Sequence, residues 1–134
     1  MINIYIDTSG SMLEMGKDSA LLYLAKSIED YCSFKDINTN FFTLDTQVIK
    51  DLTSIKFSND IKLDTNNIKS NSILLSDGLL NSEEESIFDI SFSIGIDSDT
   101  SNLKKISTKV FSSDNILAGL EYLIFTNNLL NSNI

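Results

Sequence analysis

Three oxygen-bearing side chains recur at alternate positions directly after the first apolar segment of the chain. The segment INIYI at 2–6 runs into DTSGS, which places Asp7, Ser9 and Ser11 two residues apart. Alternate side chains of an extended segment point the same way, so one carboxylate and two hydroxyls could converge on one hard cation. Gly10 lets the backbone turn tightly between them. The pattern predicts a divalent-cation site with coordination positions open to water or to a partner's carboxylate.

The same residues also fit two other structures. Ser and Asp are common N-caps, and Asx turns often follow strands, so the segment also fits a capped helix start. Loop amides at a helix N-terminus can instead hold a phosphate. Asp7 would repel that anion, and the chain has no Gly-x-x-x-x-Gly-Lys-Ser/Thr loop. The cation site and the helix start remain open alternatives.

Composition narrows the chemistry. The 134 residues carry a formal charge of −9, which opposes binding to nucleic acid or to an anionic membrane surface. The chain has no histidine and one cysteine, Cys32, which excludes His-based zinc sites, Ser-His-Asp triads and intramolecular disulfides. Any metal must therefore be held by oxygen ligands, which favours Mg²⁺, Mn²⁺ or Ca²⁺.

Length and hydropathy predict the organisation of the chain. The sequence has neither a signal-peptide pattern nor an apolar run of the roughly 20 residues that span a bilayer, so we expect a cytoplasmic protein without membrane contact. A length of 134 residues predicts a single domain, 1–134, with a tail at 126–134 that can fray.

Hydrophobic periodicity predicts strands that alternate with helices. We expect strands at Ile2–Ile6, Asn38–Leu44, Gln47–Leu52, Ile73–Leu75, Ile90–Ile96 and Lys109–Phe111, the second and third forming a hairpin, and a possible extension at Ile55–Phe57. We expect helices at Gly16–Phe34, Thr100–Ile106 and about Asn115–Phe125, the last capped by Ser113 and Asp114. The polar segment Asp60–Ser72 is expected to be a loop with a short helical turn, and Leu79–Ser86 an acidic helix or loop.

The expected helices have one apolar and one polar face. Apolar residues of the first helix recur at Leu21, Leu22, Leu24, Ala25, Ile28 and Tyr31, and the charged residues expected opposite them are Lys17, Asp18, Lys26, Glu29 and Asp30. The apolar face expected of the last helix is Ile116, Leu117, Leu120, Leu123 and Ile124. We expect Cys32 to be an inert residue of the core or its boundary.

Alternating strands and helices imply an α/β fold in which helices cover both faces of a mostly parallel sheet. Ligands in such folds bind beyond the carboxyl ends of the strands. Asp7 and Asp77 each follow an apolar strand directly, so both are expected at that edge.

The order of these motifs resembles the von Willebrand factor type A domain over nearly the whole chain. The most specific parts are IYIDTSGSM and ILLSDG, with SFSIGID as support. The resemblance implies a three-layer Rossmann-like fold with one antiparallel edge strand. It also implies a metal-ion-dependent adhesion site, with Asp7, Ser9 and Ser11 as ligands and Asp77 acting through water or a hydrogen bond.

The chain departs from the family between its third and fourth strands, where only about twenty residues stand in place of one or two helices and a threonine-bearing loop. The resemblance makes Thr65 in LDTNN the best candidate for the threonine ligand, with Thr46 and Thr53 as weaker ones. The shortened segment can also leave the site without this ligand.

Simpler roles are expected for other polar residues. We expect Asp45 to be a turn residue, Glu83–Glu85 a solvated face, and Asp97 and Asp99 helix caps, because the EF-hand glycine and glutamate are absent. Met12 and Met15 fit either a protein contact at the rim of the site or the core. No basic residue is expected in the motif loops.

The expected function is metal-dependent binding of a partner protein that supplies an Asp or Glu to the ion. Intracellular domains of the resembled family often act as assembly parts beside AAA+ ATPases, kinases or other multi-component machinery. Two alternatives remain: a structural or adaptor subunit with a decayed metal site, and a metal-assisted phosphohydrolase. The second lacks the D-x-D phosphatase loop and a general base, so we expect no enzyme.

Overall fold

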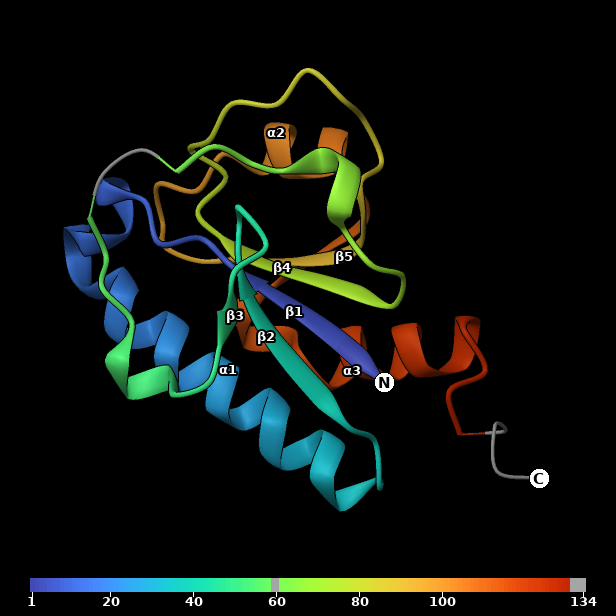
Figure 1. Ribbon diagram of the computed structural model, residues 1–134. Coiled ribbons are helices and arrows are strands. Elements are labelled where there is room, and N and C mark those ends of the chain that lie inside the picture. The colour runs from blue at the N-terminus through green and yellow to red at the C-terminus, as the bar shows by residue number, and fades with distance from the viewer. Residues whose placement is uncertain (59–60, 131–134) are drawn as a thin grey trace.

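The computed structural model describes residues 1–58 and 61–130 as a six-stranded sheet flanked by helices (Figure 1). The strands are β1 (Ile2–Ile6), β2 (Thr39–Thr43), β3 (Val48–Ile49), β4 (Ser72–Ser76), β5 (Phe88–Ser93) and β6 (Ser107–Ser112). The α-helices are α1 (Lys17–Phe34), α2 (Thr100–Ile106) and α3 (Ile116–Thr126). Short 3₁₀ segments are η1 (Gly10–Gly16), η2 (Leu52–Ser54), η3 (Thr65–Asn67) and η4 (Ser113–Asn115).

The sheet has the order β3-β2-β1-β4-β5-β6, and only β3 runs antiparallel to its neighbour. All five residues of β1 and all five of β4 are buried, as expected for central parallel strands covered on both faces. The expected α/β, Rossmann-like fold with one antiparallel edge strand is therefore confirmed. Because β1 and β4 are parallel neighbours in the sheet, their carboxyl ends lie next to each other.

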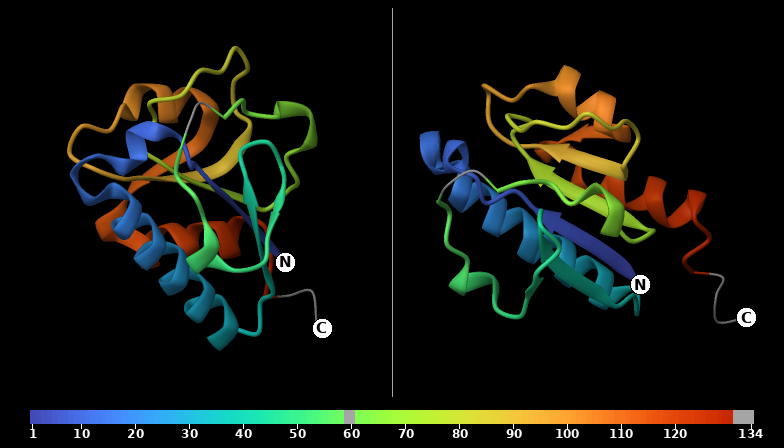
Figure 2. Two further views of the ribbon diagram at one scale, coloured as in Figure 1. Left: turned by 60° about the vertical axis from the view of Figure 1, so that its left-hand side comes forward. Right: turned by 45° about the horizontal axis from the view of Figure 1, so that its top comes forward.

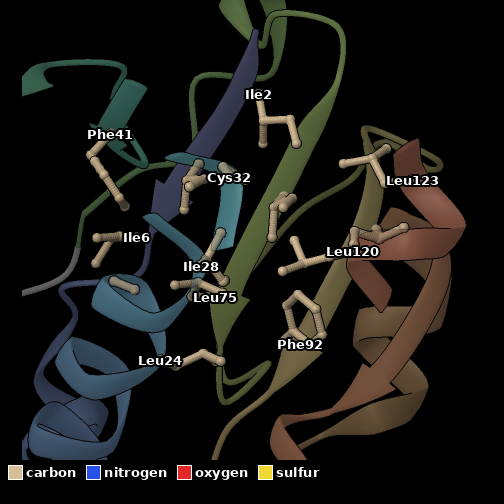
Figure 3. Packing of buried hydrophobic residues seen from close by; sticks show 14 of the residues in the cluster. Ile2, Ile6, Leu24, Ile28, Cys32, Phe41, Leu75, Phe92, Leu120 and Leu123 are labelled. Atoms are coloured by element: carbon tan, nitrogen blue, oxygen red, sulfur yellow. The ribbon is translucent and has the colours of Figure 1, made fainter. Parts of the chain in front are cut away.

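The two faces of the sheet are covered differently, as Figure 2 shows. On one face α1 and α3 pack Ile28 and Leu120, among others, against strand residues such as Leu75 and Phe92 (Figure 3). On the other face α2 and the irregular segment around Leu63 cover a smaller cluster. Apolar burial on both faces stabilises the sheet and fixes the loops at its edges.

Several boundaries differ from the predicted ones. The third strand is two residues long instead of spanning 47–52, because η2 begins at Leu52, and 55–57 forms no strand. The strand predicted over 90–96 ends at Ser93. The segment 79–86 is a loop, and 60–72 contains the expected helical turn as η3, although Asp60 lies outside the described residues. Part of the predicted fraying tail, 131–134, also lies outside them.

The start and the apolar face of α3 also differ. The Ser112 hydroxyl accepts a hydrogen bond from the Asp114 amide and caps η4, whereas Asn115 precedes α3 without a side-chain cap. The predicted cap at Ser113 and Asp114 is therefore wrong, because both residues lie inside η4 and the capping hydroxyl belongs to Ser112. Leu117 is 56% exposed, so it is not on the apolar face.

Cys32 lies in the core as predicted, and burial raises the pKa of its thiol to about 11. A thiol with that pKa is almost entirely protonated at neutral pH and is a poor nucleophile. In the described part of the chain, none of the helices combines the length and apolarity that crossing a membrane requires.

Candidate metal centre

The loop after β1 brings the three predicted ligand residues together. The Asp7 amide still donates to Leu75 O of β4 at 3.0 Å, so this residue is held at the end of the sheet. Ser9 has extended backbone, and Ser9 O accepts from the Met12 amide at 3.0 Å as the chain enters η1. The hydroxyl oxygens of Ser9 and Ser11 lie 3.3 Å apart. One carboxylate and two adjacent hydroxyls therefore lie on a single loop.

The Asp7 carboxylate is completely buried, and its hydrogen-bond partners among the described residues are neutral. Its Oδ1 accepts from the Ser9 amide at 2.9 Å, and its Oδ2 accepts from the Ser76 hydroxyl at 2.6 Å. Burial raises the pKa of Asp7, the hydrogen bonds from Ser76 and Ser9 oppose that rise, and the charge of Asp77 adds to it. No ammonium group of the described residues forms an ion pair with Asp7.

Asp77, which follows the neighbouring strand β4, has a cationic partner. Its Oδ2 accepts from Lys17 Nζ at 2.9 Å, and its Oδ1 accepts from the Leu79 amide at 3.0 Å. Lys17 also donates to both carboxylate oxygens of Asp97, at 3.0 and 2.9 Å. The side chains of Lys17 and Asp77 are 1% and 0% exposed, and that of Asp97 is 34% exposed. The ammonium thus bridges a buried and a partly exposed carboxylate.

The environment of Lys17 keeps it protonated. Burial lowers the pKa of Lys17, but hydrogen bonds with Asp97 and Asp77 outweigh burial, and the resulting pKa lies above the usual lysine value. Lys17 is the first residue of α1, so its side chain reaches from the helix N-terminus to the loops that follow β4 and β5.

Two predictions about these residues are wrong. Lys17 was expected on the solvated face of the first helix, but its side chain is buried and pairs with Asp77 and Asp97 in the loops after β4 and β5. Asp97 was expected to cap a helix, but it pairs with Lys17, whereas Asp99 does cap α2 by accepting from the Asn102 amide. One signal could have identified Lys17: a lysine in the first turn is disfavoured by the helix dipole and needs a local reason to be there.

Two glycines make room for this arrangement. At Gly95 (φ +91°) an added Cβ would lie 2.6 Å from Lys17 Cδ. At Gly78 (φ +78°) it would lie 2.4 Å from the backbone oxygen of Asp99. A side chain at either position would therefore displace the Lys17 stem or the backbone before α2, in addition to straining the left-handed backbone.

Thr65, the remaining predicted ligand, begins η3 and lines the same hollow as Ser9. The two alternatives are engaged elsewhere: Thr46 Oγ1 donates to Asp45 O at 2.7 Å, and Thr53 Oγ1 donates to Asp51 at 2.7 Å. Thr65 therefore stays the best candidate among the three threonines.

The other singled-out residues divide between core, turn and surface. Met12 is buried in the core, whereas Met15 is 62% exposed with φ +54°, so the two methionines differ. Asp45 lies in the turn between β2 and β3, as expected, and accepts a hydrogen bond from the Thr43 hydroxyl. The three glutamates at 83–85 are exposed, as predicted.

The donor set fits a hard cation with few charged ligands. Within the described residues no three or more His, Cys, Asp or Glu side chains are grouped closely enough to hold a metal on their own. Each Asp7 oxygen keeps a lone pair beyond its hydrogen bond, and the Ser9 and Ser11 hydroxyls are suitable for Mg²⁺. Asp77 already has Lys17 on one oxygen and the Leu79 amide on the other, so its role toward a cation would be indirect.

Comparison with models of known protein families gives no match, and comparison with curated protein sequences gives none either. The fold and the site therefore provide the evidence for a function.

Proposed function

We propose that this chain is a metal-ion-dependent protein-binding module. It would hold Mg²⁺, or alternatively Mn²⁺ or Ca²⁺, on Asp7, Ser9 and Ser11, with Thr65 as a further ligand. Asp77 would act on the ion indirectly, through water or a hydrogen bond. The observation that carries the proposal is the buried Asp7 carboxylate, which has neutral hydrogen-bond donors and no cationic partner among the described residues. A buried carboxylate that stays ionised is costly unless a cation compensates it.

The loop can act as an adhesive site because its own charge is low. One carboxylate would leave a divalent ion with net positive charge and open coordination positions, and an Asp or Glu of a partner protein suits both. Asp7 would hold the ion, and the hydroxyls of Ser9 and Ser11 would orient it toward the surface. Ser11 is the more accessible of the two, since Ser9 is 8% exposed and Ser11 is half-buried.

Three features support the resemblance to the von Willebrand factor type A domain. They are the six-stranded order with one antiparallel edge strand, the DTSGS loop at the end of β1, and the SDG turn at the end of β4. By that resemblance we propose a cytoplasmic adaptor within a multi-protein complex, with an AAA+ ATPase or a kinase-type component as a possible neighbour. We propose no catalytic activity, no nucleic-acid partner and no membrane contact.

One observation favours a second candidate, a structural subunit that functions without metal. Lys17 already neutralises Asp77, one of the two carboxylates that the family places at the site. If this internal cation suffices, the loops after β1, β4 and β5 form a fixed surface that binds a partner with no ion.

Thermal unfolding separates the two candidates. We expect Mg²⁺, Mn²⁺ or Ca²⁺ to raise the melting temperature by several degrees over EDTA, because a ligand at about a hundred times its Kd adds about 2.7 kcal/mol. The rise should vanish in Asp7→Ala. Asp45→Ala, an exposed carboxylate in a turn, is the matched control and should keep it. The same melting temperature in every ion and in EDTA, for the folded wild-type protein, would instead favour the structural subunit.

A further inference from the structure

A hollow of about 580 Å³ opens beside the candidate metal centre. Ser9 lines it from the loop after β1, residues 61–63 and 65 form one wall, and residues 79–84 form the other. In Figure 1 the two wall segments, green and yellow, run across the top of the view. Because Ser9 belongs to both the hollow and the candidate metal centre, an occupant of the hollow would be continuous with a group bound at that centre.

The hollow is lined by apolar as well as polar side chains. Ile61 and Leu63 contribute from one wall, and Leu79 and Leu80 from the other. Leu79 is 44% exposed although it follows Asp77 by two residues. A volume of about 580 Å³ lies within the usual range of ligand pockets and suits a few side chains of a peptide.

Charged side chains also line the walls of the hollow. Glu83 and Glu84 line the wall formed by the loop after β4, both are exposed, and neither forms an ion pair with another described residue. They lie four and five residues beyond Leu79 on that loop. Lys62 lines the opposite wall. A basic group in the hollow would therefore be attracted to the glutamate wall and repelled by the other.

We propose that the hollow receives the partner segment that flanks the metal-bound carboxylate, and that it selects a segment with a basic residue a few positions from the acidic one. The inference rests on the proposed function, since the carboxylate anchors the segment at Ser9. Apolar side chains between the two charges would contact the leucines of the walls. The acidic surface, which weakens long-range attraction of a purely acidic partner, then favours one that also carries positive charge.

Labelled peptides test the proposal directly. The probes are fluorescein-labelled, end-capped hexapeptides with one Asp, an adjacent Leu and one Lys two to four residues away on either side, with Ala elsewhere. Counterparts carry Ala in place of Lys or Asn in place of Asp. Fluorescence anisotropy in Mg²⁺ should show the best Lys peptide binding about two- to fivefold more tightly than its Ala counterpart. The Asn peptide, and EDTA, should abolish binding.

Charge-reversal variants locate the effect. Glu83→Lys/Glu84→Lys should remove the preference for Lys over Ala, whereas Glu85→Lys/Glu121→Lys should keep it. The control double variant makes the same charge change at exposed residues that do not line the hollow. All four positions are exposed, so both proteins are expected to fold like the wild type.

The alternative results separate this inference from the proposed function. Asp- and Mg²⁺-dependent binding with no preference for Lys, or a preference that survives Glu83→Lys/Glu84→Lys, overturns the role of the hollow and leaves the metal module. No peptide binding at millimolar concentration, with an Asp7-dependent melting shift in Mg²⁺, also overturns the role of the hollow alone. Absence of both peptide binding and melting shift overturns both proposals.

Discussion

Two buried carboxylates follow adjacent parallel strands, and the protein treats them in opposite ways. Asp77, after β4, is bound to the ammonium group of Lys17, whereas the donors that the described residues provide to Asp7, after β1, are the Ser9 amide and the Ser76 hydroxyl. Both side chains are 0% exposed. The difference therefore comes from partners and not from burial. Asp77 has a counter-ion within the chain, and Asp7 has none among the described residues.

Under the proposed function, Asp77 is a structural carboxylate and Asp7 is the one that binds the ion. A buried charge that has its own counter-ion stabilises one arrangement of loops, although it contributes little net stability over apolar residues. A buried charge without a counter-ion lowers stability unless a ligand supplies one. Sites with such unfavourable groups are characteristic of binding and catalysis. Substitution of Lys17 or Asp77 should therefore lower the free energy of unfolding, whereas substitution of Asp7 in the metal-free protein should raise it.

The largest effect is expected from removal of the shared ammonium. Lys17→Met should lower the free energy of unfolding by about 3–5 kcal/mol, because it leaves Asp77 buried and unpaired. Urea unfolding measures the change. Lys26→Met, which breaks an exposed pair with Glu29 and Asp30, should cost less than about 1 kcal/mol. Equal losses in the two variants would show that the buried bridge has no special role.

Removal of the charge of Asp77 should have a smaller but still destabilising effect. Asp77→Asn keeps the side-chain shape but weakens the bond to Lys17, so we expect a loss of about 2–3 kcal/mol. Asp97→Asn, at the partly exposed end of the bridge, should cost about 1 kcal/mol or less. Chemical unfolding of both variants in EDTA gives the ranking. A larger loss of unfolding free energy in Asp97→Asn than in Asp77→Asn would mean that the partly exposed ion pair with Asp97 holds Lys17 in place.

Removal of the charge of Asp7 should have a smaller effect than removal of the charge of Lys17 or Asp77, and of the opposite sign. In EDTA at neutral pH, Asp7→Asn should stabilise the protein by about 1 kcal/mol, because it removes the buried charge. The amide oxygen can still accept from the Ser9 amide, and the amide nitrogen can donate to the Ser76 hydroxyl oxygen, which reverses the direction of that bond. It should also abolish stabilisation by Mg²⁺. Destabilisation of the metal-free protein by Asp7→Asn would contradict the comparison.

The pH dependence of this variant follows from the raised pKa of Asp7. A carboxyl with a higher pKa in the folded state than in the unfolded state binds more protons when folded, so its cost to stability falls as pH falls through the folded pKa. The advantage of Asp7→Asn over wild type should therefore be greatest at neutral pH. It should shrink as the pH approaches the ordinary aspartate value. Unfolding curves of both proteins between pH 7 and about pH 4 in EDTA measure this difference.

The sequence predicted the sheet because its strands are short apolar segments with clear boundaries. The helix at Thr100–Ile106 was predicted to the residue, since Asp99 gives an explicit cap. The alternating segment 90–96 was extended too far, because alternation continues through Ile94 after the pairing with β6 has ended at Ser93. Local patterns thus located elements better than they located their ends.

The candidate site was predicted only in part. The alternation of Asp7, Ser9 and Ser11 was visible because these residues share one loop. The bridge of Lys17 to Asp77 and Asp97 was not, because it joins residues that are 60 and 80 positions apart in the chain. Helical periodicity assigned Lys17 to the polar face, because the pattern averages over the whole helix and contains no information on the tertiary contacts of its first turn. Only the sheet order brings these three residues together.

The same bridge bears on how the molecule folds. A contact between residues 60 and 80 positions apart closes long loops, and such contacts form late when chain entropy opposes them. We therefore expect the bridge of Lys17 to Asp77 and Asp97 to form only after β4 and β5 have joined the sheet. A partly folded chain that lacks β5 would then also lack the fixed arrangement of the loops after β4 and β5, so formation of the Lys17 bridge would report completion of this edge of the fold.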